Sequence, residues 1–343
     1  MKKLWKTLFI FVFLAIVLAG CGKSEKTDVG NHSGISNTEN GKKEKPYYFA
    51  PLTGFKSEKK PDHRPVAVMI NNHPLARPQS GLEKADIIYE VLAEGGVTRF
   101  LAIFQSEMPE IFGPVRSARD YYIELAKGYD AFFVAHGFSP EAKRMLDSGY
   151  IDNINGIYYD GTLFQRSKER QAPHNSYMTY ENLKKGAEKN GYSLKGMPEP
   201  LKFLQDGDEI DGTPATEVNI DYSTDSFFVR YVYDADTQTY ARYSNNKKTV
   251  DEESGNPIAL ANIFIVEMSH SVIDEKGRLE INLDSGGKAL LLQRGKVIEV
   301  EWENKEGKIL PCLAGRQVPL VPGKTWINIV PDIEQMVNVE TDS

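Results

Sequence analysis

Four apolar runs in the first half of the chain constrain its fold more than any other feature of the sequence. They occupy residues 64–70, 86–94, 97–105 and 131–136. Each run is short and rich in β-branched and aromatic residues, a pattern that predicts strands buried on both faces of a sheet. Gly95-Gly96 separates the second run from the third, and such a compact turn predicts that these two strands are antiparallel neighbours.

Signals for helices alternate with the predicted strands. Ser117 and Asp120 fit a capping pattern ahead of an apolar stretch, which predicts a helix that begins at this point. Ser139-Pro140 combines a capping residue with a proline at the first helical position, and Thr179 opens a further helix. Alternating strands and helices predict that residues 46–200 form an α/β-type domain with a mixed sheet.

The second half of the sequence carries mainly strand and turn signals. Strand-like runs occupy residues 226–233, 263–268, 290–293, 297–302 and 326–330. Arg294-Gly295 and Pro322-Gly323 lie between apolar runs and predict hairpin turns. We therefore expect a linker at 201–214, a smaller β-rich domain at 215–335 and a tail at 336–343. The fold class is α+β, and 343 residues suffice for two cores rather than one.

The first 20 residues have the layout of an export signal. Three lysines precede an apolar run that ends at small residues, and Leu18-Ala19-Gly20-Cys21 matches the bacterial lipobox. This pattern predicts a lipoprotein signal peptide at 1–20 and an acylated, palmitate-bearing Cys21 at the mature N-terminus. A permanent transmembrane helix and an unlipidated secreted protein are the alternatives, and the short run with its cleavage site fits them less well. The predicted location is the outer face of the bacterial cytoplasmic membrane.

Charge and cysteine content narrow the possible partners. The 41 basic and 48 acidic residues give a net charge of −7, which does not suggest general nucleic-acid binding. Removing residues 1–20 takes away three lysines and no acid, leaving 38 basic against 48 acidic residues. Contact with an anionic bilayer therefore depends on the acyl chains of Cys21, followed by a flexible tether that extends to residue 45. Cys312 is the remaining thiol, and its apolar neighbours predict a buried, inert side chain.

Arg116 and Arg119 lie beside the start of the helix predicted at Ser117. Free backbone N–H groups and the helix dipole favour negative charge there. Two cationic side chains at this position are therefore unfavourable unless an anion compensates their charge. A bound phosphate, carboxylate or sulfate, assisted by the Ser117 hydroxyl, is one explanation. The other is architectural, with ion pairs to acids of the adjacent strands; the candidates are Asp86, Glu90 and Glu94. The sequence leaves both open.

A second polar cluster lies in a loop with little apolar content ahead of Thr179. It contains Arg166, Arg170, His174 and Asn175, which are candidate ligand contacts. A solvated basic loop is the alternative. His73 follows the first predicted strand and His136 ends the fourth, which suggests that both lie at one rim of the sheet.

Signatures of catalysis and metal binding are missing from the sequence. It has no H-x-x-x-H, H-E-x-x-H or multi-cysteine spacing, no nucleophile elbow and no phosphate-binding loop, so neither a metal nor a cofactor is predicted. No catalytic residue is assigned. If the protein were an enzyme, His136 and His174 would be the candidates for proton transfer.

Five motifs together resemble the YerB family of bacterial lipoproteins. They are Asn71-Asn72-His73, Glu94-Gly95-Gly96-Val97-Thr98-Arg99-Phe100, Gly113-Pro114-Val115-Arg116-Ser117-Ala118-Arg119, Ala172-Pro173-His174-Asn175 and Val321-Pro322-Gly323-Lys324-Thr325-Trp326. The resemblance covers nearly the whole mature chain, from about Pro51 to Pro331. It implies two consecutive domains of unknown function and a Gram-positive envelope setting, and it supplies no reaction.

Three functional hypotheses follow. The first is a membrane-anchored, extracytoplasmic binding or adaptor protein that recognises an anionic ligand or partner segment. The residues expected to contact it are Arg99, Arg116, Arg119, Arg166, Arg170 and His174. The second is a hydrolase or transferase acting on an anionic substrate of the cell envelope. The third is a scaffold for another protein, acting through a strand edge or a hairpin of the β-rich domain such as residues 290–302.

Overall fold

The computed structural model describes residues 47–222 and 224–341. The predicted signal peptide, Cys21 and the tether lie outside these ranges. Within them, no helix has the length and apolar character needed to cross a membrane. Below, the first half of the described chain means residues 47–200 and the second half means residues 215–341.

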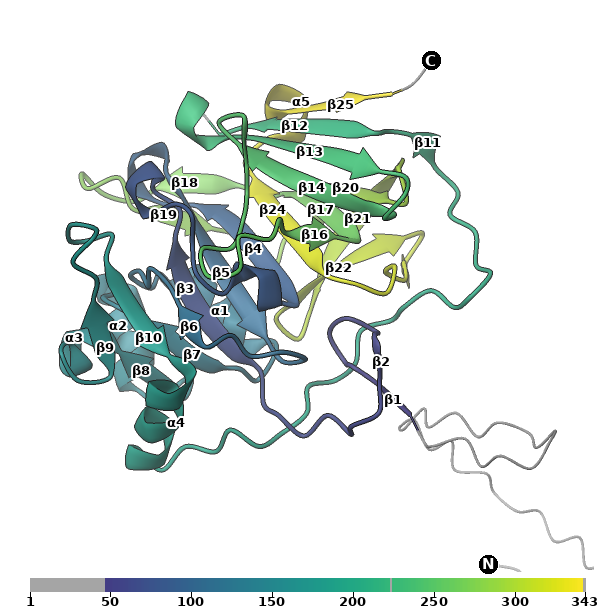
Figure 1. Ribbon diagram of the computed structural model, residues 1–343. Helices are drawn as coiled ribbons and strands as arrows, with labels where there is room; N and C mark the ends of the chain where they lie inside the picture. Colours follow the sequence, from purple (N-terminus) through teal and green to yellow (C-terminus); the bar gives the residue numbers. More distant parts are fainter. Residues whose placement is uncertain (1–46, 223, 342–343) are drawn as a thin grey trace, which may run out of the picture.

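A twelve-stranded mixed sheet runs through both halves of the chain (Figure 1). Its order is β23-β22-β21-β20-β17-β24-β4-β5-β3-β7-β8, and β11 pairs with β21. The strands of the first half are β3 (Val66–Asn71), β4 (Ile87–Leu92), β5 (Thr98–Phe104), β7 (Phe132–Ala135) and β8 (Asn153–Asn155). Those beyond it are β11 (Thr213–Pro214), β17 (Asn262–Glu267), β20 (Gly287–Gln293), β21 (Lys296–Lys305), β22 (Lys308–Leu313), β23 (Arg316–Gln317) and β24 (Thr325–Val330).

The junction between the halves is a pair of parallel strands inside this sheet. β24 lies between β17 and β4 and is parallel to both, with Trp326 opposite Ile88 and Ile263. The two halves therefore share backbone hydrogen bonds in the middle of one sheet. The sequence analysis did not predict this arrangement, and its boundaries at 46–200 and 215–335 remain predictions about the organisation of the chain.

Alternate residues of the central strands face two different cores. In β3, Ala67 and Met69 belong to one buried cluster, while Val66, Val68 and Ile70 belong to the other. Both clusters draw residues from both halves of the chain. Two cores were expected, one for each domain, but they are divided by the faces of the shared sheet because strand side chains alternate.

One face of the sheet is covered by helices. α1 (Asp120–Lys127) and α2 (Pro140–Asp147) place their apolar residues in the same cluster as Ala67 and Met69. The other face is covered by α4 (Tyr180–Lys189) over the first half and by a six-stranded sheet over the second half (Figure 1). The six-stranded sheet has the order β15-β14-β13-β12-β25, and β16 pairs with β14.

The remaining elements are short or belong to the covering layers. The six-stranded sheet consists of β12 (Glu217–Asp221), β13 (Phe228–Asp234), β14 (Thr239–Ser244), β15 (Lys247–Lys248), β16 (Ala259–Leu260) and β25 (Val337–Glu340). Smaller sheets contain β1 (Tyr48–Phe49) with β2 (Lys56–Ser57), β6 (Ile111–Phe112) with β10 (Ser176–Thr179) and β9 (Phe164–Arg166), and β18 (His270–Val272) with β19 (Leu279–Ile281). The short helices are α3 (Gly156–Tyr159) and α5 (Ile333–Met336).

Most local predictions agree with these elements. The four buried runs form β3, β4, β5 and β7, and β4 and β5 are antiparallel across Gly95-Gly96. The hydroxyls of Ser139 and Thr179 cap α2 and α4 as predicted. Arg294-Gly295 connects the antiparallel β20 and β21. Cys312 is buried and free.

Four local predictions are wrong. Pro322-Gly323 is no hairpin turn, because it leads into β24, which pairs in parallel with both neighbours. The segment read as a tail contains β25, which pairs with β12. Residues 290–302 form no protruding hairpin, because β20 pairs with β17 and β21, and β21 also pairs with β22 and β11 within the central sheet. The fourth concerns Ser117 and is described with the site.

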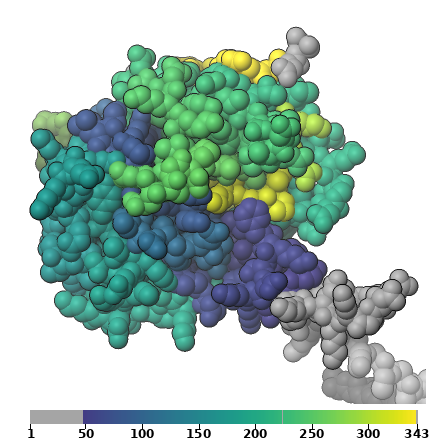
Figure 2. All heavy atoms as spheres, in the orientation of Figure 1, coloured from purple at the N-terminus to yellow at the C-terminus, as the bar shows by residue number. Residues whose placement is uncertain are grey.

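Loops reinforce the contact between the halves. The loop between β15 and β16 lies against the segment that follows β3, as the green atoms over the blue ones show in Figure 2. The backbone N–H of Glu252 donates to the carbonyl of Gln79 at 2.9 Å, and the Asp251 carboxylate accepts from the N–H of Glu83 at 3.2 Å. Strand pairing in the sheet and polar contacts at the surface thus hold the halves together.

Candidate functional site

A cavity of about 370 Å³ opens at the edge of the central sheet where β3 and β4 end and β5 begins. It is lined by Asn71, His73, Glu94, Val97, Thr98, Arg99, Arg116, Arg119 and His174. We call it the Arg116 pocket. Four of the predicted ligand-binding residues line this one pocket, namely Arg99, Arg116, Arg119 and His174. Its volume is in the range of small-molecule sites.

Backbone hydrogen bonds fix the segment that carries Arg116. The N–H of Asn71, the last residue of β3, donates to the carbonyl of Pro114 at 2.8 Å, and the N–H of Arg116 donates to the carbonyl of Met69 at 2.9 Å. The carbonyl of Arg116 accepts from the N–H of His136, just beyond β7. β3 and β7 are parallel, so both end at the same edge of the sheet. The prediction that His73 and His136 follow one rim is confirmed, although only His73 lines the pocket.

Two of the three arginines in the pocket share one carboxylate. Arg119 donates to Glu94 from Nε at 2.5 Å and from Nη2 at 2.7 Å, and Arg99 donates to Glu94 from Nη2 at 3.1 Å. The Arg99 side chain is 7% exposed, and burial lowers its pKa to about 10. Burial alone would raise the pKa of the Glu94 carboxyl, but hydrogen bonding to Arg119 and the charges of both arginines outweigh burial and lower it. Pairing with Glu94 thus confirms part of the architectural explanation.

Arg116 differs from its two neighbours. Among the described residues, its guanidinium makes no hydrogen bond and no ion pair, although its side chain is half-buried in the pocket wall. Burial and the positive charge of Arg119 lower the pKa of Arg116, and Glu94 offsets this shift only in part. The pocket therefore holds three guanidinium groups and one carboxylate, and its uncompensated charge is centred on Arg116.

Two stacked histidines also line the pocket. The rings of His73 and His174 lie 4.3 Å apart, centroid to centroid, at an interplanar angle of 22°. Burial lowers the pKa of both imidazoles, and Arg116 lowers both further. Arg77 contributes to the shift of His73, and His73 contributes to the shift of His174. Burial and the neighbouring positive charges therefore favour the neutral form of both rings.

The prediction that Ser117 caps α1 is wrong. α1 begins at Asp120 with Arg119 at the N-cap position, and no side chain caps it. The Ser117 hydroxyl instead donates to the carbonyl of His136 at 3.0 Å, and the Ser117 carbonyl accepts from Arg99 at 2.9 Å. Ser117 is not among the residues lining the pocket, and its carbonyl helps to position the Arg99 guanidinium.

The second predicted cluster does not assemble at the pocket, apart from His174. Arg166 pairs with Asp160 at 2.9 Å and donates to the side-chain oxygen of Asn175 at 3.1 Å. Its Nη2 also lies 3.1 Å from Nε2 of His136, whose Nδ1 lies 2.7 Å from the Ser176 hydroxyl. Both ring nitrogens of His136 are thus in use. These contacts hold the loop together, so Arg166 and Asn175 fit neither a ligand contact in the Arg116 pocket nor a fully solvated basic loop.

Arg170 serves the contact between the halves. It pairs with Glu252 of the second half at 2.8 Å and donates to the carbonyls of Ala76 and Pro78. Because its donors are taken up by this contact, Arg170 has an architectural explanation that needs no ligand.

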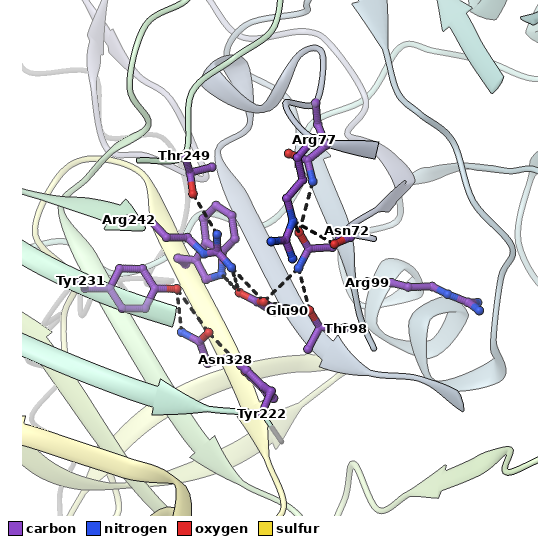
Figure 3. A network of polar contacts seen from close by, with 12 residues as sticks. Asn72, Arg77, Glu90, Thr98, Arg99, Tyr222, Tyr231, Arg242, Thr249 and Asn328 are labelled. Atoms are coloured by element: carbon purple, nitrogen blue, oxygen red, sulfur yellow. Dashed lines mark hydrogen bonds and ion pairs between the residues drawn. The ribbon is translucent and has the colours of Figure 1, made fainter. Parts of the chain in front are cut away.

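Asp86 and Glu90 do not pair with the pocket arginines. Asp86 accepts from the backbone N–H groups of Gln105 and Ser106 at 2.6 and 2.9 Å, beyond the far end of β5. Glu90 faces the six-stranded sheet and binds Arg242, and Figure 3 shows Arg99 pointing away from this cluster. Thr98 connects the two regions, because it lines the pocket and donates to Glu90 at 2.9 Å.

The predicted ligand-binding residues did not include two residues that shape the pocket, Asn71 and His73, although His73 was expected at this rim of the sheet. The Asn71 side chain binds the backbone N–H of His73 and the ring of His174, so it holds the histidine pair in place. The Asn71-Asn72-His73 motif was the available signal, but a histidine at a strand end is more often structural. The role of the motif becomes clear only in the structure, where the loop carrying His174 returns to this edge and His174 contacts Asn71 and His73.

A larger cavity of about 820 Å³ lies elsewhere, between α1, α2 and the β18–β19 hairpin. Its charged lining residues are the six acids Asp120, Glu124, Glu141, Glu280, Asp284 and Glu306 with the single base Lys127. It contains none of the predicted ligand-binding residues. Within residues 47–222 and 224–341, no three His, Cys, Asp or Glu side chains gather as a metal site would require.

Fold and pocket together define a class: a two-part α and β protein, built on one shared sheet, with a cationic pocket at the edge of the sheet. Models of a protein of unknown function, DUF3048, match both parts, the N-terminal domain at residues 52–193 and the C-terminal domain at 218–327. The "Putative lipoprotein YerB" of Bacillus subtilis (strain 168) is 49% identical over 337 residues, which cover 97% of each chain.

A solved structure agrees with this relationship. The crystal structure of the YerB protein from Bacillus subtilis matches with a TM-score of 0.81 and 51% identity, over 86% of this chain and 100% of that chain. The chain therefore belongs to the YerB family, as its motifs predicted.

Proposed function

We propose that this protein is a lipid-anchored binding protein of the bacterial cell envelope, which holds an anionic ligand in the Arg116 pocket. The observation that carries the proposal is the Arg116 guanidinium, half-buried and without a partner among the described residues, in a pocket where three arginines face one carboxylate. A buried cation without a partner is costly, and a bound anion removes that cost.

The lipid anchor is supported by the sequence and by the relative. The lipobox at Cys21 follows an export signal, and the Bacillus subtilis relative carries the name of a lipoprotein. Acylation of Cys21 would place the folded part outside the cytoplasmic membrane, with residues 22–45 as a tether. Cells that express Cys21→Ser should release the protein from the membrane fraction or retain the uncleaved precursor. Membrane retention of a processed Cys21→Ser chain would contradict the anchor.

Ligand binding is tested by thermal unfolding of the purified full-length protein in detergent. Phosphate, sulfate and acetate are titrated as sodium salts, with sodium chloride at equal ionic strength as the reference. Binding to the folded state raises the melting temperature as the ligand concentration rises. We expect at least one oxyanion to stabilise the protein, and we expect Arg116→Met to lose this effect while the protein stays folded.

Arg166→Met is the matched control. It also removes one arginine from the predicted site residues, but Arg166 lies outside the pocket and pairs with Asp160. This variant should lose some stability and keep the full response to the anion. Equal responses of wild type and Arg116→Met to every anion would refute binding in this pocket.

A further inference from the structure

Hydrogen bonds fix the tautomers of both histidines in the Arg116 pocket. The backbone N–H of Leu75 approaches Nδ1 of His73 at 3.2 Å. A backbone N–H can only donate, so this Nδ1 is an acceptor and carries no proton. In the neutral ring the proton must then be on Nε2.

The same reasoning applies to His174, through Asn71. The Oδ1 atom of Asn71 accepts from the backbone N–H of His73 at 3.0 Å, which fixes the orientation of the amide. Its Nδ2 therefore points to Nδ1 of His174, at 3.0 Å, and donates to it. His174 thus also carries its proton on Nε2, and neither Nε2 has a partner among the described residues.

Each side-chain oxygen that lines the pocket already accepts at least one hydrogen bond. Both oxygens of Glu94 bind arginines, Oδ1 of Asn71 binds His73, and the Thr98 hydroxyl accepts from Asn72 at 2.7 Å. Within the part of the chain that the structure describes, the pocket-lining side-chain groups without partners are N–H donors, on Arg116, His73 and His174. A ligand that meets only donors must itself present acceptors, as an oxyanion does.

The net charge of the pocket indicates how many negative charges that oxyanion carries. With both histidines neutral, three guanidinium groups and one carboxylate leave two uncompensated positive charges in the pocket. A carboxylate or phosphodiester would neutralise one of them, whereas a dianion would neutralise both. Phosphate monoesters are dianionic near neutral pH and offer three terminal acceptor oxygens.

We propose that the ligand carries a dianionic oxyanion of the phosphate-monoester class, bound by Arg116 and by the Nε2–H groups of His73 and His174. This inference rests on the proposed function, because it names the chemistry of the same pocket. It also assigns the histidines a role. With Nδ1 engaged and Nε2 already protonated, the neutral rings are donors to the ligand, not general bases.

The experiment is calorimetric titration of the full-length protein in detergent at pH 7.5 with methyl phosphate, dimethyl phosphate and acetate. Methyl phosphate is dianionic at this pH, and the other two are monoanions. We expect methyl phosphate to bind about tenfold or more tightly than either monoanion, since one further charge pair in a half-buried site is worth at least that factor. Equal affinities would overturn the inference and leave anion binding intact. No binding of any anion would overturn the proposed function as well.

Variants test the two histidine donors. His73→Phe and His174→Phe keep a ring in the stack but remove the N–H, so each should weaken methyl phosphate binding several-fold, and His174→Gln should restore part of it. NMR of the imidazole nitrogens provides a readout independent of binding and of these substitutions. It should show the Nε2–H tautomer for both rings in the unliganded protein, and an Nδ1–H tautomer at either ring would overturn the assignment.

A monoester can be presented by a soluble molecule or by a lipid headgroup. The protein is therefore reconstituted into phosphatidylcholine vesicles with and without phosphatidic acid, and methyl phosphate is titrated into both. Weaker apparent affinity in the presence of phosphatidic acid would show that the headgroup occupies the pocket, and unchanged affinity would point to a soluble ligand. Both outcomes support the monoester class.

Discussion

The Glu90 carboxylate and the Arg242 guanidinium, 152 residues apart in the sequence, form an ion pair at 2.8 Å in which the side chains are 0% and 1% exposed. The Glu90 oxygens also accept from Thr98 at 2.9 Å (Figure 3) and from the indole N–H of Trp326 at 3.1 Å. Arg242 stacks over the Trp326 ring as well, at 4.6 Å from its centroid. One carboxylate of the first half thus collects donors from β5, β14 and β24.

Removing one member of this pair should destabilise the whole protein. Arg242→Met leaves the Glu90 charge buried with only neutral donors, and breaking a buried pair in this way costs about 3–5 kcal/mol. Glu90→Leu with Arg242→Met replaces the pair by apolar groups and should cost less than the sum of the two single changes. Urea unfolding followed by fluorescence and circular dichroism measures all three. If the loss of stability in the double variant equalled the sum of the losses in the two single variants, the two side chains would not be coupled.

Because the pair spans the two halves, the same unfolding curves report on cooperativity. We expect a single transition in the wild-type protein, with both spectroscopic signals changing together, because the halves share a sheet and two cores. Two separated transitions would indicate that the halves unfold independently despite their shared strands.

Arg116 and Arg119 should respond in opposite ways to loss of charge. Arg116→Met removes a half-buried cation that has no partner within residues 47–222 and 224–341, so stability without ligand should stay constant or rise. Arg119→Met breaks two hydrogen bonds to Glu94 and should cost about 1–3 kcal/mol. Thermal unfolding in chloride buffer compares them. If Arg116→Met proved as destabilising as Arg119→Met, Arg116 would be architectural.

Local sequence patterns were sufficient for the strands and for part of the pocket. Buried runs, the Gly95-Gly96 turn and the hydroxyl caps at Ser139 and Thr179 depend on residues a few positions apart, and they were predicted. The insertion of β24 between β17 and β4 depends on the pairing of β24 with β4, which are more than 200 residues apart in the sequence. No local pattern contains that information, so the shared sheet was missed.

The pocket, too, was predictable from the sequence only in part. Arg99, Arg116 and Arg119 lie on neighbouring segments of the first half, and their grouping followed from the strand–turn–helix order. Which acid would pair with them was beyond the sequence, because Glu90 and Glu94 are both close in the chain but face different directions. Glu90 faces the six-stranded sheet, and the turn after β4 leaves Glu94 at the pocket.

Glu94→Gln should lower stability and raise anion affinity together. The substitution removes the negative charge shared by Arg99 and Arg119, so the folded protein loses two ion pairs. It also leaves three guanidinium groups without any carboxylate in the pocket, which strengthens the attraction for an anion. In thermal unfolding the melting temperature should fall, whereas in sulfate titration the affinity should rise. A parallel loss of both would mean that Glu94 only positions the arginines.

The pH dependence of stability follows from the histidine pair. The pKa values of His73 and His174 are lower in the folded protein than the usual value of about 6.5, because burial and nearby arginines disfavour the imidazolium form. The unfolded chain therefore binds more protons below that pH, so the pair's contribution to stability is complete above about pH 6.5 and is lost as the pH falls toward the folded pKa values.

Sulfate should reduce this loss. Its charge stays constant over the range, and an anion beside Arg116 favours the cationic form of both rings, so the increase in melting temperature caused by sulfate should grow from pH 7.5 to pH 5.5. The groups that act on the two rings are Arg77, Arg116 and the rings themselves. The double variant His73→Phe with His174→Phe is the control for other titrating groups, and its response to sulfate should vary less with pH. If wild type and double variant gave the same pH profile, the histidines would not be coupled to the anion.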